Sequence, residues 1–380
     1  MTRLPLPTVS DPELLIDDPA ALTPEWLSRA LGLPVRATRH APIGTGQIGG
    51  SYRVELEYAG PVPSEAPTSV VAKIAVGTEA QRAQVSRAFV SEVGFYLHLA
   101  DRVKARIPHC WYGAISTDHT RFTLILEDLT PSVPGNQAAG CTLEQAHDAV
   151  QNLAALHASF WNDEFLVSGL EWLTLPTTEL AQLAGVALQG ATETFVERFG
   201  ADLAHEDAAT LAAAATVVTE WVLSHQTPFS LVHGDYRLDN LMFPRSGTGS
   251  AALDWQGLSI GHPGRDLAYF VALSLPPDLR REHEHELVAA YHSALVGHGV
   301  RGFSPDDCLA GYRVGMLQGP LITVLGCVYS PAERTADADA MFLSMASRSA
   351  RAIRDLGTVE LISAPRHEPA ADRRSGSPPG

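Results

Sequence analysis

The sequence predicts an α+β protein built from two lobes, a small β-rich lobe followed by a larger helical one. Three observations support this prediction. The chain has 380 residues, more than one ordinary domain, and 45% of them are hydrophobic, enough to form a sizeable core. Strand patterns are concentrated between about residues 35 and 127. From Thr142 onward, long helical patterns dominate.

The first lobe is expected to span residues 1–126. Thr23, Pro24 and Glu25 supply the N-cap, the first-turn proline and the first-turn acid of a short helix. Apolar residues alternate or run together in three later segments, which we expect to be strands, and the stretch between the second and third is helical in pattern. The strands are predicted at 52–58, 69–76 and 121–126, and the helix at 79–103.

The second lobe is expected to span residues 127–364. Thr142 and Gln145 are spaced as a capping box, and Val150 and Trp161 lie on one apolar face of the helix that follows. The longest apolar stretch, 315–329, is short and interrupted by Gly and Pro, so it is typical of a buried helix. Residues 365–380 lack apolar side chains, and we expect a disordered tail there.

Composition excludes several classes of function. The formal charge of −16 argues against nucleic acid as a partner, because such binding needs clustered Lys and Arg. The N-terminus carries prolines and acids rather than the basic start and apolar run of a signal peptide, so we expect a cytoplasmic protein without a membrane segment. The four cysteines are scattered and indicate neither a zinc site nor a disulfide framework. The oligomeric state stays open.

The most informative segment for function is 231–243, which reads LVHGDYRLDNLMF. It places Asp235 and, five residues later, Asn240 on one loop, and Asp254 follows in the next strand-like segment. Phosphoryl transfer needs a carboxylate that accepts or orients the proton of the attacking hydroxyl, and oxygen ligands for Mg²⁺. These three side chains are candidates for that chemistry. The alternative is an Asp and an Asn that cap a turn at a strand end.

This pattern resembles the catalytic loop and metal-binding element of the aminoglycoside phosphotransferase and choline kinase-like superfamily. The spacing from Asp235 to Asn240 also agrees with that of protein kinases. The resemblance covers residues 43–273 by motifs. It implies a bilobal protein kinase-like fold with a small N-terminal antiparallel β lobe, which carries one main helix, and a larger, mainly helical C-terminal lobe. The letters HGDYRLDN, with Leu156, His157 and Trp161, look nearer the ecdysteroid kinase-like and hydroxyacyl kinase-like members.

The resemblance also implies a role for each residue of the motif. Asp235 would act as the catalytic base or orient the hydroxyl. Asn240 and Asp254 would be the ligands of Mg²⁺. His233 would support the loop through hydrogen bonds rather than transfer protons. Arg237 would neutralise charge on the moving phosphoryl group, or instead form an ion pair with a neighbouring acid.

A glycine-rich segment near the N-terminus is the candidate nucleotide loop. Gly44, Gly46 and Gly49 form G-x-G-x-x-G, a pattern that dinucleotide-binding folds share. Such a fold would continue into a helix, whereas here polar and apolar residues alternate from Tyr52 as in a strand. A glycine hairpin could then close over phosphates with no Cβ in the way. The alternative is a simple turn that uses glycine for positive φ.

Lysine usage indicates the phosphate contact. The 27 basic residues comprise 25 arginines and two lysines, Lys73 and Lys104. Lys73 lies in the apolar segment VVAKI, where an ammonium needs a partner. The resemblance implies two, the α and β phosphates of the nucleotide and a Glu of the next helix, for which Glu92 is best placed. The alternative is an exposed charge on an edge strand and a solvated helix face.

Two further segments complete the expected site. Residues 127–129 occupy the position of the hinge between lobes, where the backbone of Glu127 and Leu129 would bind adenine. Asp266 would cap its helix or accept hydrogen bonds from the backbone of the catalytic loop. Only twelve positions separate Asp254 from Asp266, too few for the segment on which protein kinases dock peptides.

The sequence therefore predicts a phosphotransferase that uses ATP and Mg²⁺ and acts on a hydroxyl of a small organic molecule. Two alternatives stay open. One is a kinase that acts on protein, and the other is a catalytically silent nucleotide-binding module. The identity of the acceptor and the preference for ATP over GTP are not fixed by these patterns.

Overall fold

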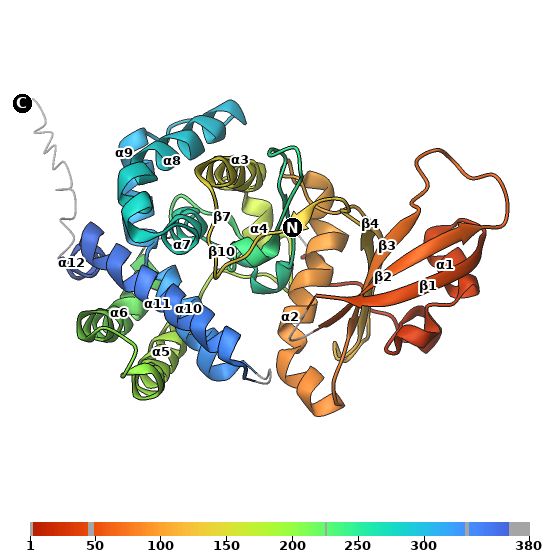
Figure 1. Cartoon of the computed structure of the whole chain (residues 1–380), viewed down its shortest axis with the longest axis horizontal. Helices are drawn as coiled ribbons and strands as arrows, with labels where there is room; N and C mark the ends of the chain where they lie inside the picture. The colour runs from red at the N-terminus through yellow and green to blue at the C-terminus, as the bar shows by residue number, and fades with distance from the viewer. Residues whose placement is uncertain (1–2, 45–48, 225, 331–333, 365–380) are drawn as a thin grey trace, which may run out of the picture.

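The computed structural model describes residues 3–44, 49–224, 226–330 and 334–364. It confirms the predicted α+β fold with two lobes (Figure 1). The N-terminal lobe holds a five-stranded antiparallel sheet in the order β1-β2-β3-β5-β4. Its strands are β1 Val35–Ile43, β2 Gly49–Tyr58, β3 Ser69–Ala75, β4 Cys110–Ile115 and β5 Phe122–Glu127. Gly46 and the expected tail at 365–380 lie outside the described residues.

The alternation of side chains in β3 decides which residues face each helix of this lobe. Val70, Ala72 and Ile74 join the cluster around α1, Pro24–Leu31. Side chains at the intervening positions point to the opposite face, where α2, Glu79–His98, packs. Lys73 is one of these, so its ammonium faces the helix that carries Glu92.

Helix α2 begins where the sequence predicts and ends sooner. Thr78 and Gln81 form a capping box at its start. The prediction of a helix as far as residue 103 is wrong, because α2 ends at His98 and a 3-10 turn, Ala100–Arg102, follows. The Arg102 guanidinium lies over the rings of Phe160 and Phe165, at 5.1 Å and 4.9 Å, so a contact with the other lobe holds this turn.

Helix α2 is packed directly against the C-terminal lobe. A Cβ at Gly94 would lie 2.7 Å from the ring of Trp172, so glycine allows this close approach. One residue on, Phe95 stacks on Trp255 with ring centroids 3.7 Å apart. The helix that carries Glu92 is therefore fixed relative to the segment that carries Asp254.

The C-terminal lobe is mainly helical (Figure 1). Its helices are α3 Leu143–Ser159, α4 Glu164–Ser168, α5 Thr178–Phe199, α6 His205–Ser224, α7 Gly264–Ser274, α8 Pro277–Gly297, α9 Pro305–Gly315, α10 Gln318–Tyr329, α11 Ala336–Leu356 and α12 Thr358–Ser363. The capping box of Thr142 and Gln145 is present at the start of α3. The apolar stretch 315–329 is divided, because α9 ends at Gly315 and α10 starts at Gln318.

Short strands lie on either side of the turns that contain Asn240 and follow Asp254. Strand β7, Ser230–Val232, pairs with β10, Ser259–Gly261, and a second small sheet has the order β6-β8-β9. The strands of the second sheet are β6 Val133–Pro134, β8 Leu241–Phe243 and β9 Ala251–Ala252. Two 3-10 turns, η4 Leu238–Asn240 and η5 Trp255–Gly257, lie between these strands.

The segment before α1 contacts both lobes. The N–H of Leu4 donates to the carbonyl of Gly169 in the C-terminal lobe at 2.7 Å. The N–H of Val9 donates to Ile115 of the sheet at 2.8 Å. Figure 1 shows this end of the chain lying between the two lobes.

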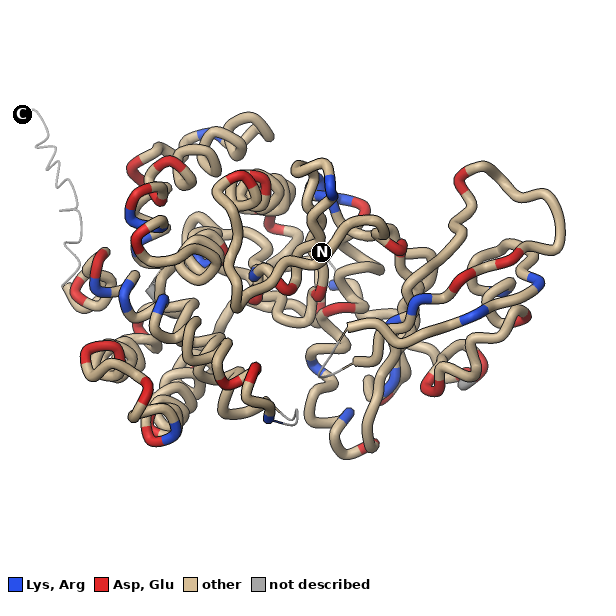
Figure 2. The backbone as a smooth tube through the Cα atoms, viewed as in Figure 1, with Lys and Arg blue, Asp and Glu red and all other residues tan. Residues whose placement is uncertain are grey.

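The structure places the charged residues and the cysteines as follows. Acidic and basic positions are interspersed over both lobes (Figure 2). The four cysteines are free thiols. No helix among the described residues is both long enough and apolar enough to cross a membrane.

Candidate active site

The catalytic loop follows β7 and presents Asp235. Its Oδ1 accepts a hydrogen bond from the hydroxyl of Tyr269 at 2.7 Å. Its Oδ2 accepts from Asn240 Nδ2 at 3.0 Å and from Arg237 Nε at 3.2 Å. Three donors from the loop and from α7 thus fix the orientation of this carboxylate, which is partly open to solvent.

Gly234 is required for the chain to turn between His233 and Asp235. Its φ is +86°, and a Cβ would lie 2.1 Å from the carbonyl oxygen of Gly257. Any other residue would both adopt an unfavourable backbone conformation and collide with a neighbouring backbone. The glycine of the HGD motif is therefore explained by geometry rather than by contact with a ligand.

Asp266 accepts hydrogen bonds from the backbone of the catalytic loop. Its carboxylate accepts from the N–H of His233 at 2.6 Å and from the N–H of Gly234 at 3.0 Å. Nε2 of His157 lies 3.2 Å away. Burial would raise the pKa of Asp266, but the hydrogen bond from His157 and the charges and N–H groups around it outweigh burial, so the pKa is lowered. The second expected function of Asp266, that of a backbone acceptor, is the one observed.

Both ring nitrogens of His233 form hydrogen bonds. Nε2 lies 2.9 Å from the carbonyl oxygen of Leu253, an arrangement in which the ring N–H donates. Nδ1 then accepts from the N–H of Asp235 at 3.3 Å. The ring ties the catalytic loop to the strand that leads to Asp254, a geometry that fits the expected supporting role.

The amide of Asn240 and the carboxylate of Asp254 are brought together by the backbone. The N–H of Leu253 donates to the carbonyl of Asn240 at 2.9 Å. Asn240 directs Nδ2 at both the carbonyl and the carboxylate of Asp235, which leaves its Oδ1 turned away from them. Asp254 has φ 62° and ψ 79°, an uncommon backbone conformation for a residue other than glycine.

The oxygens of these two residues suit Mg²⁺. Asp254 Oδ1 is buried and receives no hydrogen bond from the described residues, although Lys73 Nζ lies 3.5 Å away. A buried carboxylate oxygen without a donor is expected where a cation belongs. The described residues contain no group of three or more His, Cys, Asp or Glu side chains placed to hold a metal. Mg²⁺ is commonly held by one or two protein oxygens together with substrate phosphates and water, so the set fits that ion.

Lys73 joins the two halves of the site. Its Nζ lies 2.7 Å from Oε1 of Glu92, and Gln256 Nε2 donates to Oε2 of the same carboxylate at 3.0 Å. Burial would lower the pKa of Lys73, but the carboxylates of Asp254 and Glu92 outweigh burial, so the pKa is raised. Burial raises the pKa of Glu92, partly offset by Lys73. The predicted pair between strand and helix is present in the structure.

The glycine hairpin lies beside Lys73. Gly44 has φ +69°, and Gly49 begins β2. A Cβ at Gly49 would lie 3.3 Å from the carbonyl oxygen of Ile74 and 3.5 Å from Cε of Lys73. A side chain at Gly49 would therefore be in ordinary contact with the lysine and would press on the backbone of Ile74.

Hydrogen bonds to the segment before β4 occupy part of the hinge. The carboxylate of Glu127 accepts from Arg106 Nη1 at 2.9 Å and from the N–H of His109 at 3.0 Å. The N–H of Glu127 donates to the carbonyl of His109 at 2.8 Å. This N–H is thus used within the fold, and the backbone donor expected to meet a base is that of Leu129.

Asp128 ties the hinge to the sheet. Its carboxylate accepts from Arg53 Nε and Ser69 Oγ, both at 2.7 Å. It also accepts from the N–H and the hydroxyl of Thr130. Burial would raise the pKa of Asp128, but these hydrogen bonds and Arg53 outweigh burial, so the pKa is lowered.

Arg237 forms the ion pairs that the sequence left as an alternative. Its guanidinium lies 3.2 Å from Asp235 and 3.0 Å from Asp239, and its Nη1 also contacts the sulfur of Met341 at 3.3 Å. Burial would lower the pKa of Arg237, but the neighbouring acids outweigh burial, so the pKa is raised. The cation lies beside the catalytic carboxylate, with α11 covering it.

Sequence reasoning missed several residues of the site. Tyr269 lies one helical turn after Asp266, and Gln256 lies two residues after Asp254. Their closeness in sequence to predicted site residues could have indicated both. Gln318, whose Nε2 donates to the carbonyl of Gly234 at 2.8 Å, has no local signal. Met341 has none either, because it reaches the site from another part of the chain.

The connection between Asp254 and Asp266 contains only the turn η5 and the strand β10. Strand β10 pairs with β7, which leads directly into the catalytic loop. No separate segment for docking a peptide lies between these two acids, as the spacing predicts.

Comparisons with known proteins bear on the fold and the family. The choline kinase of Cryptosporidium parvum Iowa II has a similar structure, with a TM-score of 0.51 and 10% identity over 90% of this chain and 96% of that one. A candidate aminoglycoside phosphotransferase from Ralstonia eutropha JMP134 aligns with a TM-score of 0.49 and 19% identity over 89% and 98% of the two chains. At such identity, the similarity to the choline kinase shows a shared fold, the bilobal kinase-like one.

Among curated proteins, the human acyl-CoA dehydrogenase family member 11 is 41% identical over 58 residues, which are 14% of this chain and 7% of that protein. The chain thus matches a small part of that relative's length. The sequence profile of the ecdysteroid kinase-like family matches residues 48–300, a range that begins beside the glycine hairpin and includes Lys73, Asp235 and Asp266. That range is more than half of the chain, so the chain belongs to the ecdysteroid kinase-like family.

Proposed function

We propose that this protein is a small-molecule kinase that transfers the γ-phosphoryl group of ATP, with Mg²⁺, to a hydroxyl of an organic acceptor. One observation carries the proposal. The carboxylate of Asp235 accepts from Asn240 at 3.0 Å, and Asp254, joined to Asn240 through the backbone of Leu253, lies 3.5 Å from Lys73. These contacts support the proposal of a base, two oxygen ligands and a phosphate-binding cation in one site where the lobes join.

The nucleotide half of the site positions the phosphates. Lys73, held by Glu92, would contact the α and β phosphates, and the hairpin beginning at Gly44 would cover them with backbone N–H groups. Leu129 would offer its N–H to the base. Mg²⁺, when bound by Asn240 and Asp254, would neutralise charge on the phosphate oxygens.

The acceptor half of the site carries the proton transfer. The acceptor oxygen forms a bond to the γ-phosphorus, the bond from that phosphorus to the bridging oxygen of ADP breaks, and the hydroxyl proton passes to Asp235. Tyr269 and Asn240 hold the carboxylate in position, so little reorganisation is needed when the acceptor arrives. Arg237 is near enough to stabilise charge on the group in transit.

Two features favour a small acceptor. The segment between Asp254 and Asp266 is too short to dock a peptide, and α11 reaches Arg237 through Met341, which narrows the space beside the catalytic loop. The family name and the name of the choline kinase both refer to kinases of small molecules. We also place the boundary between the lobes at Leu126 and Glu127, where β5 ends.

The test is a screen of hydroxylated metabolites, steroids and antibiotics for acceptor-dependent release of ADP. For any acceptor found, Asp235→Asn should lower kcat by about 10² to 10⁴, the range expected when a general base is lost. Asp239→Asn is the matched control, because it removes from the same loop another acid that pairs with Arg237, whereas the side-chain amide of Asn240 donates to Asp235. An acceptor-dependent rate that survives Asp235→Asn would disprove the mechanism.

The same experiment separates the two alternatives. Transfer of label from ATP to generic protein substrates, with none to small molecules, would favour a protein kinase. Nucleotide binding without turnover on the whole panel would favour a silent module. In that case Lys73→Met should still weaken binding of ATP.

A further inference from the structure

A second candidate site lies in the C-terminal lobe, away from the phosphotransfer residues. It is a cavity of about 390 Å³ bounded by the end of α3, by α6, by the start of α7 and by α9 with the loop before it. It lies near the end of the small sheet where Ser230 pairs with Gly261, whereas the catalytic loop leaves β7 at the other end. The size is within the range of small-molecule sites.

The cavity is a preformed space in a tightly packed region. A Cβ at Gly264 would lie 2.4 Å from the carbonyl oxygen of Gly311, and one at Gly315 would lie 2.2 Å from that of Gly264. The backbone of α9 therefore packs directly against the start of α7. Elements in such close contact have little freedom to move into the cavity. The remaining space has walls of fixed shape.

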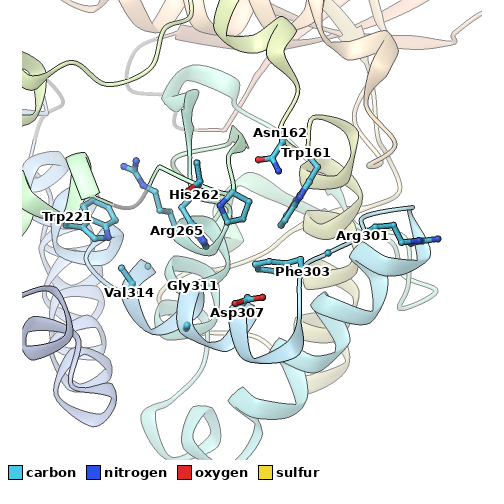
Figure 3. Close-up of a pocket in the computed structure, with 15 residues that line it drawn as sticks. Trp161, Asn162, Trp221, His262, Arg265, Arg301, Phe303, Asp307, Gly311 and Val314 are labelled. Carbon is cyan, nitrogen blue, oxygen red and sulfur yellow. The ribbon is translucent and has the colours of Figure 1, made fainter. Parts of the chain in front are cut away.

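Aromatic rings form much of the wall. Trp161 and Phe303 meet edge to face, with centroids 4.9 Å apart. On the other side the guanidinium of Arg265 lies over the indole of Trp221, at 4.4 Å. Figure 3 shows Arg265 between Trp221 and the aromatic pair, with Arg301 directed away from the centre. The walls thus suit a flat apolar body.

The cation in the cavity has no acid as a partner. Arg265 donates through Nε to the neutral oxygen of Gln318 at 3.0 Å, and no carboxylate of the described residues forms an ion pair with it. Asp266, the next residue, is used by the catalytic loop and His157. Burial lowers the pKa of Arg265 to about 10, an effect that Asp266 partly offsets. Arg265 is half-buried, and a partly desolvated cation without a counterion is costly, so an anion in the cavity would relieve that cost.

We propose that this cavity binds a small organic acid with a flat apolar body, whose carboxylate pairs with Arg265. Asp307 lines the cavity as well, and its carboxylate is held by the N–H and hydroxyl of Ser304. In Figure 3 it lies below Phe303, on α9. A second negative charge on the ligand near this carboxylate is therefore disfavoured, so the preferred ligand is a monoanion.

The cavity is connected to the catalytic loop by two hydrogen bonds. Arg265 donates to Oε1 of Gln318, and Nε2 of the same amide donates to the carbonyl of Gly234 at 2.8 Å. Gly234 precedes Asp235. An acid that draws the guanidinium toward the cavity would change the first bond and, through the amide, the second. Occupancy is thereby coupled to the order of the catalytic loop.

The binding test uses 1-naphthoate as the probe, measured by calorimetry without nucleotide or acceptor. We expect wild type to bind it and Arg265→Met to bind at least 10-fold more weakly. Arg301→Met is the matched control, because this arginine donates to the backbone carbonyls of Val296 and Val300 and points away from the cavity. The neutral 1-naphthalenemethanol should bind wild type at least 10-fold more weakly than the acid does.

Two further variants locate the probe. Ala310→Trp, in an exposed position of the cavity wall, should also abolish binding, whereas Lys73→Met in the phosphotransfer site should leave it unchanged. Absence of binding to wild type, or equal binding by Arg265→Met, would refute the site. Loss of binding in Lys73→Met would place the probe in the nucleotide cleft and refute the site equally. None of these readouts depends on phosphotransfer, so the proposed function can fail without affecting them.

Coupling is read by hydrogen exchange over residues 231–238. Saturating 1-naphthoate should change exchange at least 3-fold in wild type, and Gln318→Leu should bind the probe but lose that response. Unchanged exchange in wild type at saturation would show that the cavity is not linked to the loop. An undiminished response in Gln318→Leu would exclude this amide as the connection.

Discussion

The two halves of the site are built in different ways. In the C-terminal half, Asp235 and the loop around it are held by Tyr269, by Gln318 and by the fully buried Asp266. In the N-terminal half, Lys73 is held by the carboxylate of Glu92 and lies 3.5 Å from Asp254. Asp235, the proposed base, is thus held by hydrogen bonds from several donors before any substrate arrives. Lys73, the proposed phosphate contact, is held by ion pairs with side chains.

This difference teaches which substitutions should affect stability and which only activity. In the C-terminal half, Asp266 is fully buried and hydrogen-bonded to backbone, so its loss leaves unpaired polar groups in the core. In the N-terminal half, Lys73 retains 12% of its side-chain exposure and pairs with a side chain rather than with backbone. We expect stability and activity to fall together in the first half and to separate in the second.

The largest effect is expected for Asp266→Asn. The amide cannot accept from His233, Gly234 and His157 as the carboxylate does, so the free energy of unfolding should fall by about 3–5 kcal/mol. Activity should fall with it. Urea denaturation measures the first and the ADP assay the second. Asp278→Asn is the control, since that side chain is 97% exposed. A change below 1 kcal/mol would remove the basis for calling this half the rigid one.

Lys73→Met should separate activity from stability. Loss of the phosphate contact should lower kcat/KM by about 10² to 10³, as for removal of one stabilising donor at a reacting group. Stability should fall less than in Asp266→Asn, because the raised pKa of Glu92 allows this carboxyl to take up a proton. Adding Glu92→Leu should recover stability and not activity.

Lys104→Met is the control for that experiment. Lys104 is the other lysine of the chain and donates to the carbonyl of His298 at 3.1 Å, far from the site in sequence. It should change neither measurement. If Lys73→Met destabilised the fold as much as Asp266→Asn, the contrast between the two halves would be wrong.

The hinge should show a dependence on pH. Asp128→Asn should lower the free energy of unfolding by about 2 kcal/mol at neutral pH, because it loses charge-assisted hydrogen bonds. The pKa of Asp128 is lowered in the folded state, so its contribution is complete above the unfolded pKa, about 3.9, and is lost as pH falls through the lower folded value. The difference between wild type and variant should therefore shrink below about pH 4. A difference that stays constant down to pH 3 would contradict this assignment.

The smallest effect is expected for Gly44→Ala. A Cβ there meets nothing within 4 Å, so the cost is the positive φ alone, about 1 kcal/mol of stability. If the hairpin covers phosphates, KM for ATP should rise up to about fivefold, since that energy corresponds to such a factor. Gly60→Ala, which also meets nothing and has no positive φ, is the control. An unchanged KM would favour the simple turn.

Much of the fold was accessible from local patterns. Period-2 alternation predicts β2 and a run of apolar residues predicts β3. The capping boxes at Thr78 and Thr142 mark where α2 and α3 begin. Ends were harder to predict, because the turn after His98 is held by Arg102 against Phe160 and Phe165 of the other lobe. Those partners are too far from Arg102 in the sequence for a local pattern to show them.

The candidate site divides in the same way. Asp235, Asn240 and Asp254 are close in sequence, and Lys73 and Glu92 stand out as a charged pair within apolar segments, so the types and spacing of these residues determined the chemistry to look for. Tyr269, Gln256 and Gln318, and the cavity around Arg265, were decided by tertiary structure. Their functions depend on hydrogen bonds between segments far apart in the chain, and such bonds exist only once hydrophobic packing has placed the helices. The sequence alone determined which groups can react, and the packing of α7, α10 and α11 decided what holds them.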